Sequence, residues 1–247
     1  VWEKTHLFLL SFVVGYLGLS IQIQTGSLGS ALSHLGLGER AVLGAWSLLA
    51  QLGKQLLPIG LSPYHPYPRE LSSMHYLGAF GLLGVVVLLV RSSRWRRDLT
   101  LGLGFFFVNL LFVLQVVCAG DAFLAERFTY VGSVGVTFLV ARGYQELGAS
   151  RLPRGGSRAL AAAALAGLGV MSVGRIGIWK DSEALWSSVI QRYPDQAAVA
   201  WTNRGSHFLQ EGRLDEAERD SRRAVALDPE QTHAWNNLGR IRYERGD

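Results

Sequence analysis

Long apolar runs, almost free of charge, fill the chain from Val1 to Trp179 and limit the folds open to it. Charged residues make up 17% of the whole sequence, but they are sparse before Trp179 and frequent from Lys180 to Asp247. The first part has too few charged groups to cover a soluble surface, and the second has an ordinary soluble composition. We therefore expect a membrane domain over 1–179 and a soluble domain with a separate core over 180–247.

Six runs approach the length of about 20 mostly apolar residues that a bilayer span requires. They are His6–Gln24, Ala41–Leu57, Ser73–Val90, Leu99–Gly120, Phe128–Ala141 and Ala159–Ile178. Lys54 interrupts the second run, which is therefore either a span or a helix lying in the membrane interface. The fifth run is too short to span, so its helix is expected to begin earlier, near Ala122. The predicted fold is all-α, with a multi-pass helix bundle in the membrane.

Two arginine clusters predict how this bundle is oriented. Arg91–Arg97 contains four arginines, and Arg142–Arg158 contains four arginines and one acid. Both segments should face the cytoplasm, because positive loops are retained there. Pro58–Ser72, Asp121–Arg127 and everything after Trp179 then face the other side. The net charge of +5 is thus explained by membrane topology, and no nucleic-acid partner is predicted.

The soluble part contains an internal repeat. Trp201 and Gly205 recur as Trp235 and Gly239, and each Trp follows a proline closely. This interval matches the period of about 34 residues that is typical of the tetratricopeptide repeat, a helix–turn–helix unit that stacks into an α-solenoid. Gly205 shares a helix face with Trp201 and should let the second helix approach closely. Such arrays bind protein partners on their concave face.

The second repeat stops after its first helix, at Asp247, and the first apolar run follows Val1 almost directly. We therefore expect the sequence to be part of a longer protein in which the array continues.

The first predicted outward loop holds one group of candidate site residues. Leu57–Leu71 contains four prolines, which favour a stiff extended segment, together with Tyr64, His65 and Tyr67. The loop is either a rigid connector at the membrane surface or the floor of a site for a lipid headgroup. No second metal ligand stands at a recognisable spacing from His65, so no metal site is predicted.

The second predicted outward loop contains Glu126 and Arg127 between two apolar runs, with Tyr130 close behind. Ionisable groups at membrane depth are costly and often mark function. Two interpretations remain open. The pair ends a helix at the membrane surface, or the planar guanidinium of Arg127 is held to bind a lipid phosphate.

Four motifs follow one another along the chain: "LSPYHPYP", "AERFTYVGSVG", "WKDSEALW" and then the repeats. This order resembles the C-terminal part of the transmembrane, tetratricopeptide-containing O-mannosyltransferase-like proteins and their bacterial relatives in the GT-C glycosyltransferase superfamily. The family usually has Pro where this chain has Gly132. The resemblance implies transfer of a sugar from a polyprenyl-phosphate carrier to a protein or glycan hydroxyl, on the non-cytoplasmic face. No nucleotide-binding glycine loop is present, which fits a lipid-linked donor, and no cofactor is expected.

The resemblance also implies roles for the candidate residues. Arg127 would bind the donor phosphate, Glu126 and Tyr130 would orient it, and the loop with Tyr64, His65 and Tyr67 would wall the donor cavity. The family's acidic catalytic residue belongs to a loop upstream of Val1, so the catalytic residue is unknown. The alternative is a non-catalytic, membrane-anchored tetratricopeptide scaffold that binds proteins. A transporter ranks third, because no predicted span carries a charge at its midplane.

The predicted topology can be tested with single cysteines at Ser92 and Gln210, in a background in which Cys118, the only cysteine, is replaced by Ala. A membrane-impermeant maleimide should label the two positions from opposite sides of the membrane. Labelling of both from the cytoplasmic side would contradict the orientation.

Overall fold

The computed structural model describes residues 5–24, 35–68, 70–92, 94–111, 122–124, 126–150 and 154–246. The predicted all-α class is confirmed, because within these ranges the chain forms ten α-helices and no β-strand. The helices are α1 (Thr5–Gln24), α2 (Leu37–Leu56), α3 (Ser73–Arg91), α4 (Arg96–Leu111), α5 (Ser133–Ser150), α6 (Arg154–Ile176), α7 (Ser182–Arg192), α8 (Ala198–Gln210), α9 (Leu214–Leu227) and α10 (Thr232–Arg245). Short 3-10 helices occupy Glu126–Thr129 (η2) and Gly177–Trp179 (η3). Cys118 and Asp121 lie outside the described residues, as do 112–120 of the fourth predicted span.

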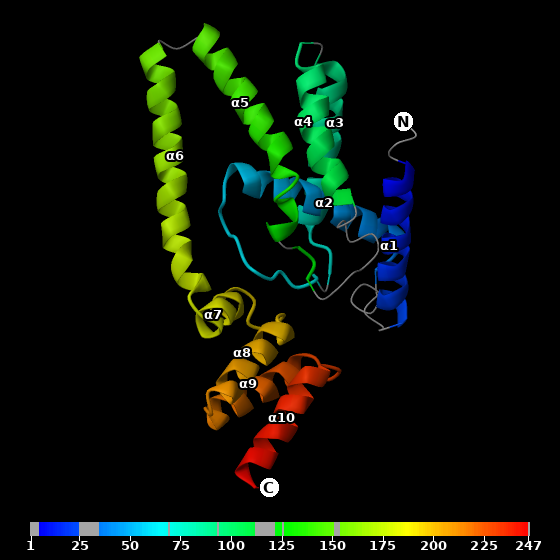
Figure 1. Ribbon diagram of the computed structural model, residues 1–247, viewed down its shortest axis with the longest axis vertical. Coiled ribbons are helices and arrows are strands. Elements are labelled where there is room, and N and C mark those ends of the chain that lie inside the picture. Colours follow the sequence, from blue (N-terminus) through cyan, green and yellow to red (C-terminus); the bar gives the residue numbers. More distant parts are fainter. Residues whose placement is uncertain are drawn as a thin grey trace.

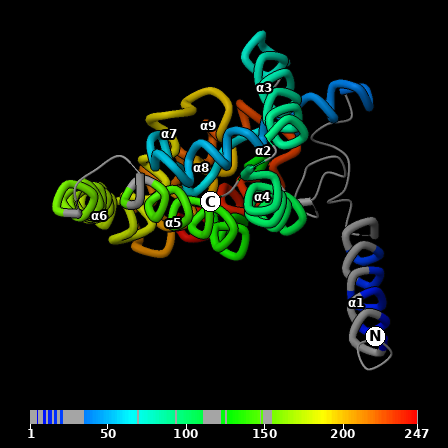
Figure 2. The backbone as a smooth tube through the Cα atoms, turned by 90° about the horizontal axis from the view of Figure 1, so that it is seen from above, coloured from blue at the N-terminus to red at the C-terminus, as the bar shows by residue number. Residues whose placement is uncertain are grey.

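Helices α3 to α6 run roughly along the long axis of the molecule, whereas α2 crosses beneath α3 and α4 (Figure 1). The view from above also shows α2 extended across the helices that are seen end on (Figure 2). Residues of α2 that include Leu43 and Leu48 are buried against its neighbours. This crosswise placement favours the second of the two alternatives for this segment, a helix in the membrane interface.

Two helices within the described residues are long and apolar enough to cross a membrane, Ser73–Arg91 and Gly155–Trp179. Both coincide with predicted spans. The other predicted spans, and therefore the number of crossings, stay predictions.

The fifth predicted helix begins later than expected. Residues 126–129 form the 3-10 helix η2, and α5 begins only at Ser133, so the predicted start near Ala122 is wrong. The reason is an antiparallel bridge between His65 and Leu124, with the Phe123 N–H donating to the His65 carbonyl at 2.9 Å. This pairing holds residues 122–124 extended. The helix gains its length at the other end instead, running on to Ser150.

The end of α3, the start of α4, the end of α5 and the start of α6 lie at one end of the bundle, opposite the end that carries α7 to α10 (Figure 1). Two ion pairs join them: Arg94 Nη2 lies 2.7 Å from Glu146 Oε2, and Arg142 Nε lies 3.0 Å from Asp98 Oδ2. The start of α4 and the end of α5 are thus held together. Both arginine clusters therefore occupy the same end of the helices, as the predicted topology requires.

Close packing at glycine joins α4 to α5. A Cβ atom added at Gly135 would overlap the carbonyl oxygen of Gly102. Only glycine at both positions allows the two backbones to come this near. Helices that pack without a hydrophobic driving force in lipid commonly use such small residues.

The sequence repeat corresponds to a helix–turn–helix unit formed by α8 and α9, followed by α10. The indole N–H of Trp201 donates to the Pro194 carbonyl at 3.0 Å, and that of Trp235 donates to the Pro229 carbonyl at 2.9 Å. The same hydrogen bond thus recurs one period later, as the predicted register requires. Between the helices lies a cluster of buried residues: Phe208, Leu209, Ala217 and Ile241.

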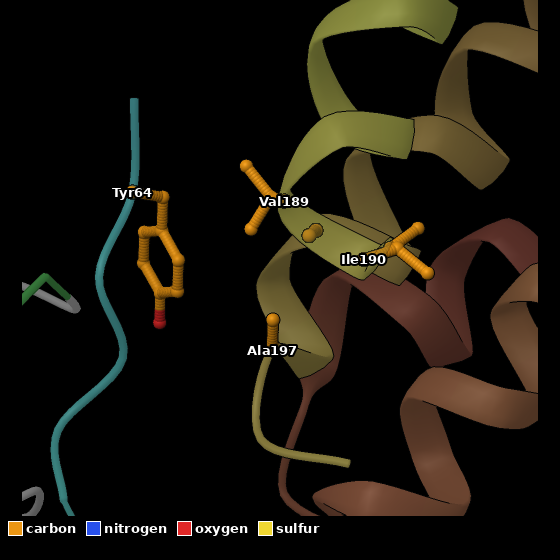
Figure 3. Close-up of a cluster of buried hydrophobic side chains, with 5 residues drawn as sticks. Tyr64, Val189, Ile190 and Ala197 are labelled. Atoms are coloured by element: carbon orange, nitrogen blue, oxygen red, sulfur yellow. The ribbon is translucent and has the colours of Figure 1, made fainter. Parts of the chain in front are cut away.

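Each of the two predicted parts has buried clusters of its own, and one further cluster joins them, which the expectation of separate cores did not include. Tyr64, from the proline-rich loop, is only 9% exposed and packs with Val189, Ile190, Ala197 and Ala200 of the repeat segment. Its ring faces Val189 and Ala197 (Figure 3). Burial of the apolar ring stabilises this contact, because the loop itself has little apolar surface that could cover Tyr64.

The tight approach of α9 to α8 predicts different effects for one substitution at equivalent positions of the two repeats. A Cβ at Gly205 would lie 3.0 Å from Ser221 Oγ and 3.3 Å from the Ala217 carbonyl, whereas none of the described atoms lies within 4 Å of a Cβ at Gly239. Gly205→Leu should therefore destabilise the chain by about 1–3 kcal/mol through overpacking. Gly239→Leu should be neutral or stabilise it by up to about 1 kcal/mol, since Leu favours helix.

Thermal melts of the two variants in detergent would check this difference. Equal melting temperatures would contradict the helix pairing.

Candidate functional site

The carboxylate of Glu126 is the centre of a polar cluster at the lower end of the bundle. Its Oε1 atom lies 2.8 Å from Lys54 Nζ, 2.9 Å from His65 Nε2 and 3.1 Å from the backbone nitrogen of Ser62. The Glu126 side chain is 25% exposed and that of Lys54 is 17% exposed. All three contacts fall on one oxygen, and among the described residues the second, Oε2, has no partner.

Four segments bring these groups together. Lys54 comes from the last turn of α2, Ser62 and His65 from the proline-rich loop, and Glu126 from η2. The His65–Leu124 bridge sets His65 beside η2. The fourth segment is the repeat region: Tyr193, just after α7, has its hydroxyl 2.7 Å from His65 Nδ1.

Burial and hydrogen bonds together determine which groups of the cluster are charged at pH 7. Burial raises the pKa of the Glu126 carboxyl, but the hydrogen bonds from His65 and Lys54 outweigh it and bring the pKa down to about 2. Burial lowers the pKa of His65, against the opposing effect of its hydrogen bond to Glu126. His65 is thus neutral at pH 7. A proton on Nε2 satisfies both its contact with Glu126 and the contact of Nδ1 with the Tyr193 hydroxyl, whereas Lys54 Nζ, 2.8 Å from the same Nε2, would need that nitrogen as an acceptor. A carboxylate with so low a pKa is a poor general base, and its chemistry is that of a fixed negative charge.

A cavity of about 720 Å³ lies on one side of this cluster, between the proline-rich loop, η2 and the lower end of α6. Arg175 lines this cavity, and its Nη2 donates to the Leu61 carbonyl at 2.9 Å. The described lining residues are Pro58, Leu61, Ser62, Glu126, Tyr130, Met171, Ser172, Arg175, Ile176, Gly177, Trp179 and Lys180. Positive charge and apolar side chains therefore meet in one cavity.

The three residues predicted to bind the donor phosphate do not all line the same cavity. Glu126 and Tyr130 line the larger cavity, although they lie on a 3-10 helix and a turn rather than on one α-helical face. Arg127 is exposed and lies with its guanidinium 5.1 Å from the centre of the Phe128 ring. It is not among the described residues that line this cavity.

The three predicted site residues of the proline-rich loop also lie in different surroundings. Tyr64 is buried against α7, and Tyr67 packs against Phe123 with 6.0 Å between ring centres. His65 joins the Glu126 cluster and lines a second, smaller cavity.

Sequence reasoning missed three contributors to this region. In the sequence, Lys54 is only an interruption of an apolar run, and Arg175 lies near the end of the last predicted span without a predicted role. Tyr193 lies in the soluble part and carried no signal at all. An isolated lysine and an isolated glutamate, each in apolar surroundings, are a signal that could have paired Lys54 with Glu126.

One group of side chains in the repeats has the composition of a metal site. The possible ligand atoms of Glu183, His207 and Glu211 lie within 4.8 Å of one another. Arg213 Nη1 already lies 2.7 Å from Glu183 Oε2 and 3.1 Å from Glu211 Oε2. The guanidinium thus occupies the space and neutralises the charge that a cation would need.

Neither a protein-family profile nor a solved structure matches this chain. A curated relative does: protein O-mannosyl-transferase TMTC1 of Mus musculus is 34% identical over 121 residues. The match covers 48% of this chain and 13% of that protein. The chain is therefore similar to a small part of that protein, which supports a loose relationship of the kind that the sequence motifs suggested.

The polar cluster predicts a loss of stability in mild acid. Because the folded-state pKa of His65 lies below its usual 6.5, the unfolded chain binds more protons as the pH falls below that value, and stability decreases. The stabilisation that Glu126 contributes is lost at lower pH, as the pH falls from 4.5, the usual pKa of the carboxyl, toward its folded-state pKa of about 2. The melting temperature should thus fall between about pH 7 and pH 5, and less steeply in His65→Asn. His233→Asn, at an exposed position, is the matched control. Parallel curves for all three proteins would contradict the role of His65.

Proposed function

We propose that this chain is part of a membrane glycosyltransferase, and that its larger cavity holds the phosphate of a polyprenyl-phosphate sugar donor. The observation that carries the proposal is the meeting of positive and apolar groups in one cavity at the end of a helix long and apolar enough to span a membrane. Arg175 and Lys180 line the cavity together with Met171, Ile176 and Trp179. A polyprenyl phosphate has the same two parts, an anionic head and an apolar tail.

The charge of the cavity suits a phosphate. Arg175 offers a planar guanidinium, which binds phosphate oxygens in pairs. Lys54 borders an adjoining space of about 430 Å³ that Glu126 and Tyr130 also border. The one carboxylate among the described lining residues, Glu126, is engaged through Oε1 by Lys54, His65 and Ser62. It orients these donors and does not repel an incoming anion as an unpaired carboxylate would.

The apolar part of the donor has a surface to follow. Exposed residues run along α6 above the cavity, among them Leu165, Val170, Val173 and Ile176. A helix of 23 residues is about 34 Å long, roughly the thickness of the hydrocarbon core of a bilayer. A prenyl chain lying against α6 would thus leave its phosphate at the level of Arg175.

The type of transfer comes from similarity. The relative's name, protein O-mannosyl-transferase, suggests a mannosyl donor and a protein hydroxyl as acceptor. The residues described here would bind and orient the donor, on the side of the membrane that the predicted topology makes non-cytoplasmic. The general base stays a prediction for a carboxylate outside the described cavity lining.

A non-catalytic membrane scaffold is the second candidate function. The low pKa of Glu126, about 2, favours it, because the described cavity lining then holds no carboxylate suited to proton transfer. The scaffold would use the repeats to bind proteins, and it would bind no lipid-linked sugar.

Donor binding is the test, with the full-length protein in nanodiscs and a polyprenyl-phosphate mannose as ligand. Arg175→Ala should weaken binding by about 2–5 kcal/mol if it removes the partner of the phosphate. Arg175→Lys should have a smaller effect, because it keeps the charge and loses the planar fork.

Arg127→Ala separates the two arginines. Unchanged affinity in this variant would leave the phosphate with Arg175, and a loss confined to it would move the phosphate to Arg127, as predicted from the sequence alone. No binding by the well-folded wild type would favour the scaffold.

A further inference from the structure

A second, smaller cavity lies on the other side of the polar cluster and has a different character. Its volume is about 290 Å³. Its described lining comes from α2, the proline-rich loop, the first turn of α3, residues 123–124 and the end of α7 with the residues that follow it. Two members of the polar cluster, Lys54 and His65, line this cavity. The repeat segment contributes Arg192, Tyr193 and Gln196.

The described lining holds positive and neutral groups and neither Asp nor Glu. Lys54 and Arg192 supply the positive charge, and His75 adds an imidazole whose Nδ1 is already 2.9 Å from the Ser72 nitrogen. The carboxylate of Glu126 lies beyond Lys54 and is bonded to it. The cavity therefore favours a negatively charged group.

Arg192 is the residue best placed to bind such a group. Arg192 is exposed, and its Nε donates to the Tyr193 hydroxyl at 3.1 Å. Among the described residues, neither Nη group has an acceptor. Gly60, with φ of 65°, brings the loop backbone so close that an added Cβ would lie 2.8 Å from Arg192 Nη2. The guanidinium thus lies against the loop, and both of its Nη groups are available as donors.

The remaining walls suit an extended polypeptide. Trp46 and Phe123 are stacked with 5.6 Å between ring centres, and Tyr193 adds a third aromatic ring from the repeat segment. Pro66 and Pro68 present a stiff edge without N–H donors. A volume of about 290 Å³ admits one or two side chains and is small for a prenyl chain. The cavity also lacks the α6 residues that line the larger one.

We propose that this smaller cavity binds a carboxylate side chain of an acceptor polypeptide, with Arg192 as its principal partner. The acceptor would lie between the proline-rich loop and α7, across the polar cluster from the donor phosphate. The identification of the bound polypeptide as the acceptor rests on the proposed function. The binding of a carboxylate in this cavity does not depend on it.

Calorimetry on the full-length protein in nanodiscs tests the proposal with two capped hexapeptides, one with a single glutamate and one with glutamine in its place. The glutamate peptide should bind, and the glutamine peptide should bind at least about tenfold more weakly, the size expected for one charge-assisted hydrogen bond. Arg192→Gln should remove this preference. Arg222→Gln is the matched control, because Arg222 pairs with Glu218 on α9 and does not line the cavity.

Equal binding of the two peptides, or an unchanged preference in Arg192→Gln, would overturn the proposal. Binding of inorganic phosphate without binding of the glutamate peptide would also overturn it, since the cavity would then be a site for free anions.

Binding of polyprenyl-phosphate mannose, measured on the same samples, separates the two claims. Donor binding that survives in Arg192→Gln, together with no peptide preference in the wild type, leaves the proposed function standing and removes only the acceptor site.

Discussion

The partly buried carboxylate of Glu126, with the groups that bind it, is the interaction on which the lower half of this molecule depends. Removing a carboxylate from water costs several kcal/mol unless partners replace the lost hydration. Lys54, His65 and Ser62 supply those partners, all within 3.1 Å of one oxygen. The loop that carries His65 and Ser62 has little regular structure of its own to hold it there. The charge and its partners therefore fix one another, and with them the path of the proline-rich loop.

The same interaction extends into the repeat segment. His65 bonds Glu126 through one ring nitrogen and the Tyr193 hydroxyl through the other. Next to it, Tyr64 packs against α7 and α8. Polar and apolar contacts thus fasten the same short loop to the repeats. A shift of α7 would move His65, and through it the donors that surround the larger cavity. The repeat segment therefore contributes to the walls of the site.

The sequence predicts the elements of this fold better than it predicts their junctions. Period and composition identified the helices, because a run of apolar residues or a recurring Trp and Gly is a local pattern. The start of α5 was missed, since the bridge between His65 and Leu124 joins residues far apart in the chain. Glu126 and His65 were selected for their chemistry, but their contact with each other and with Tyr193 depends on tertiary structure.

The Glu126 cluster contributes different members to the two cavities: Ser62 and Glu126 line the larger one, and Lys54 and His65 line the smaller one. Lys54 lines the smaller cavity and not the larger, and its bond to Glu126 neutralises it partly, so each cavity depends on a further cation of its own. That cation is Arg175 toward α6 and Arg192 toward α7. An apolar donor tail fits only the first side, because only there do exposed α6 residues continue the cavity. Under the two proposals the cluster would thus lie between a lipid-linked donor and a polypeptide acceptor, with Glu126 as a fixed charge because its pKa is about 2.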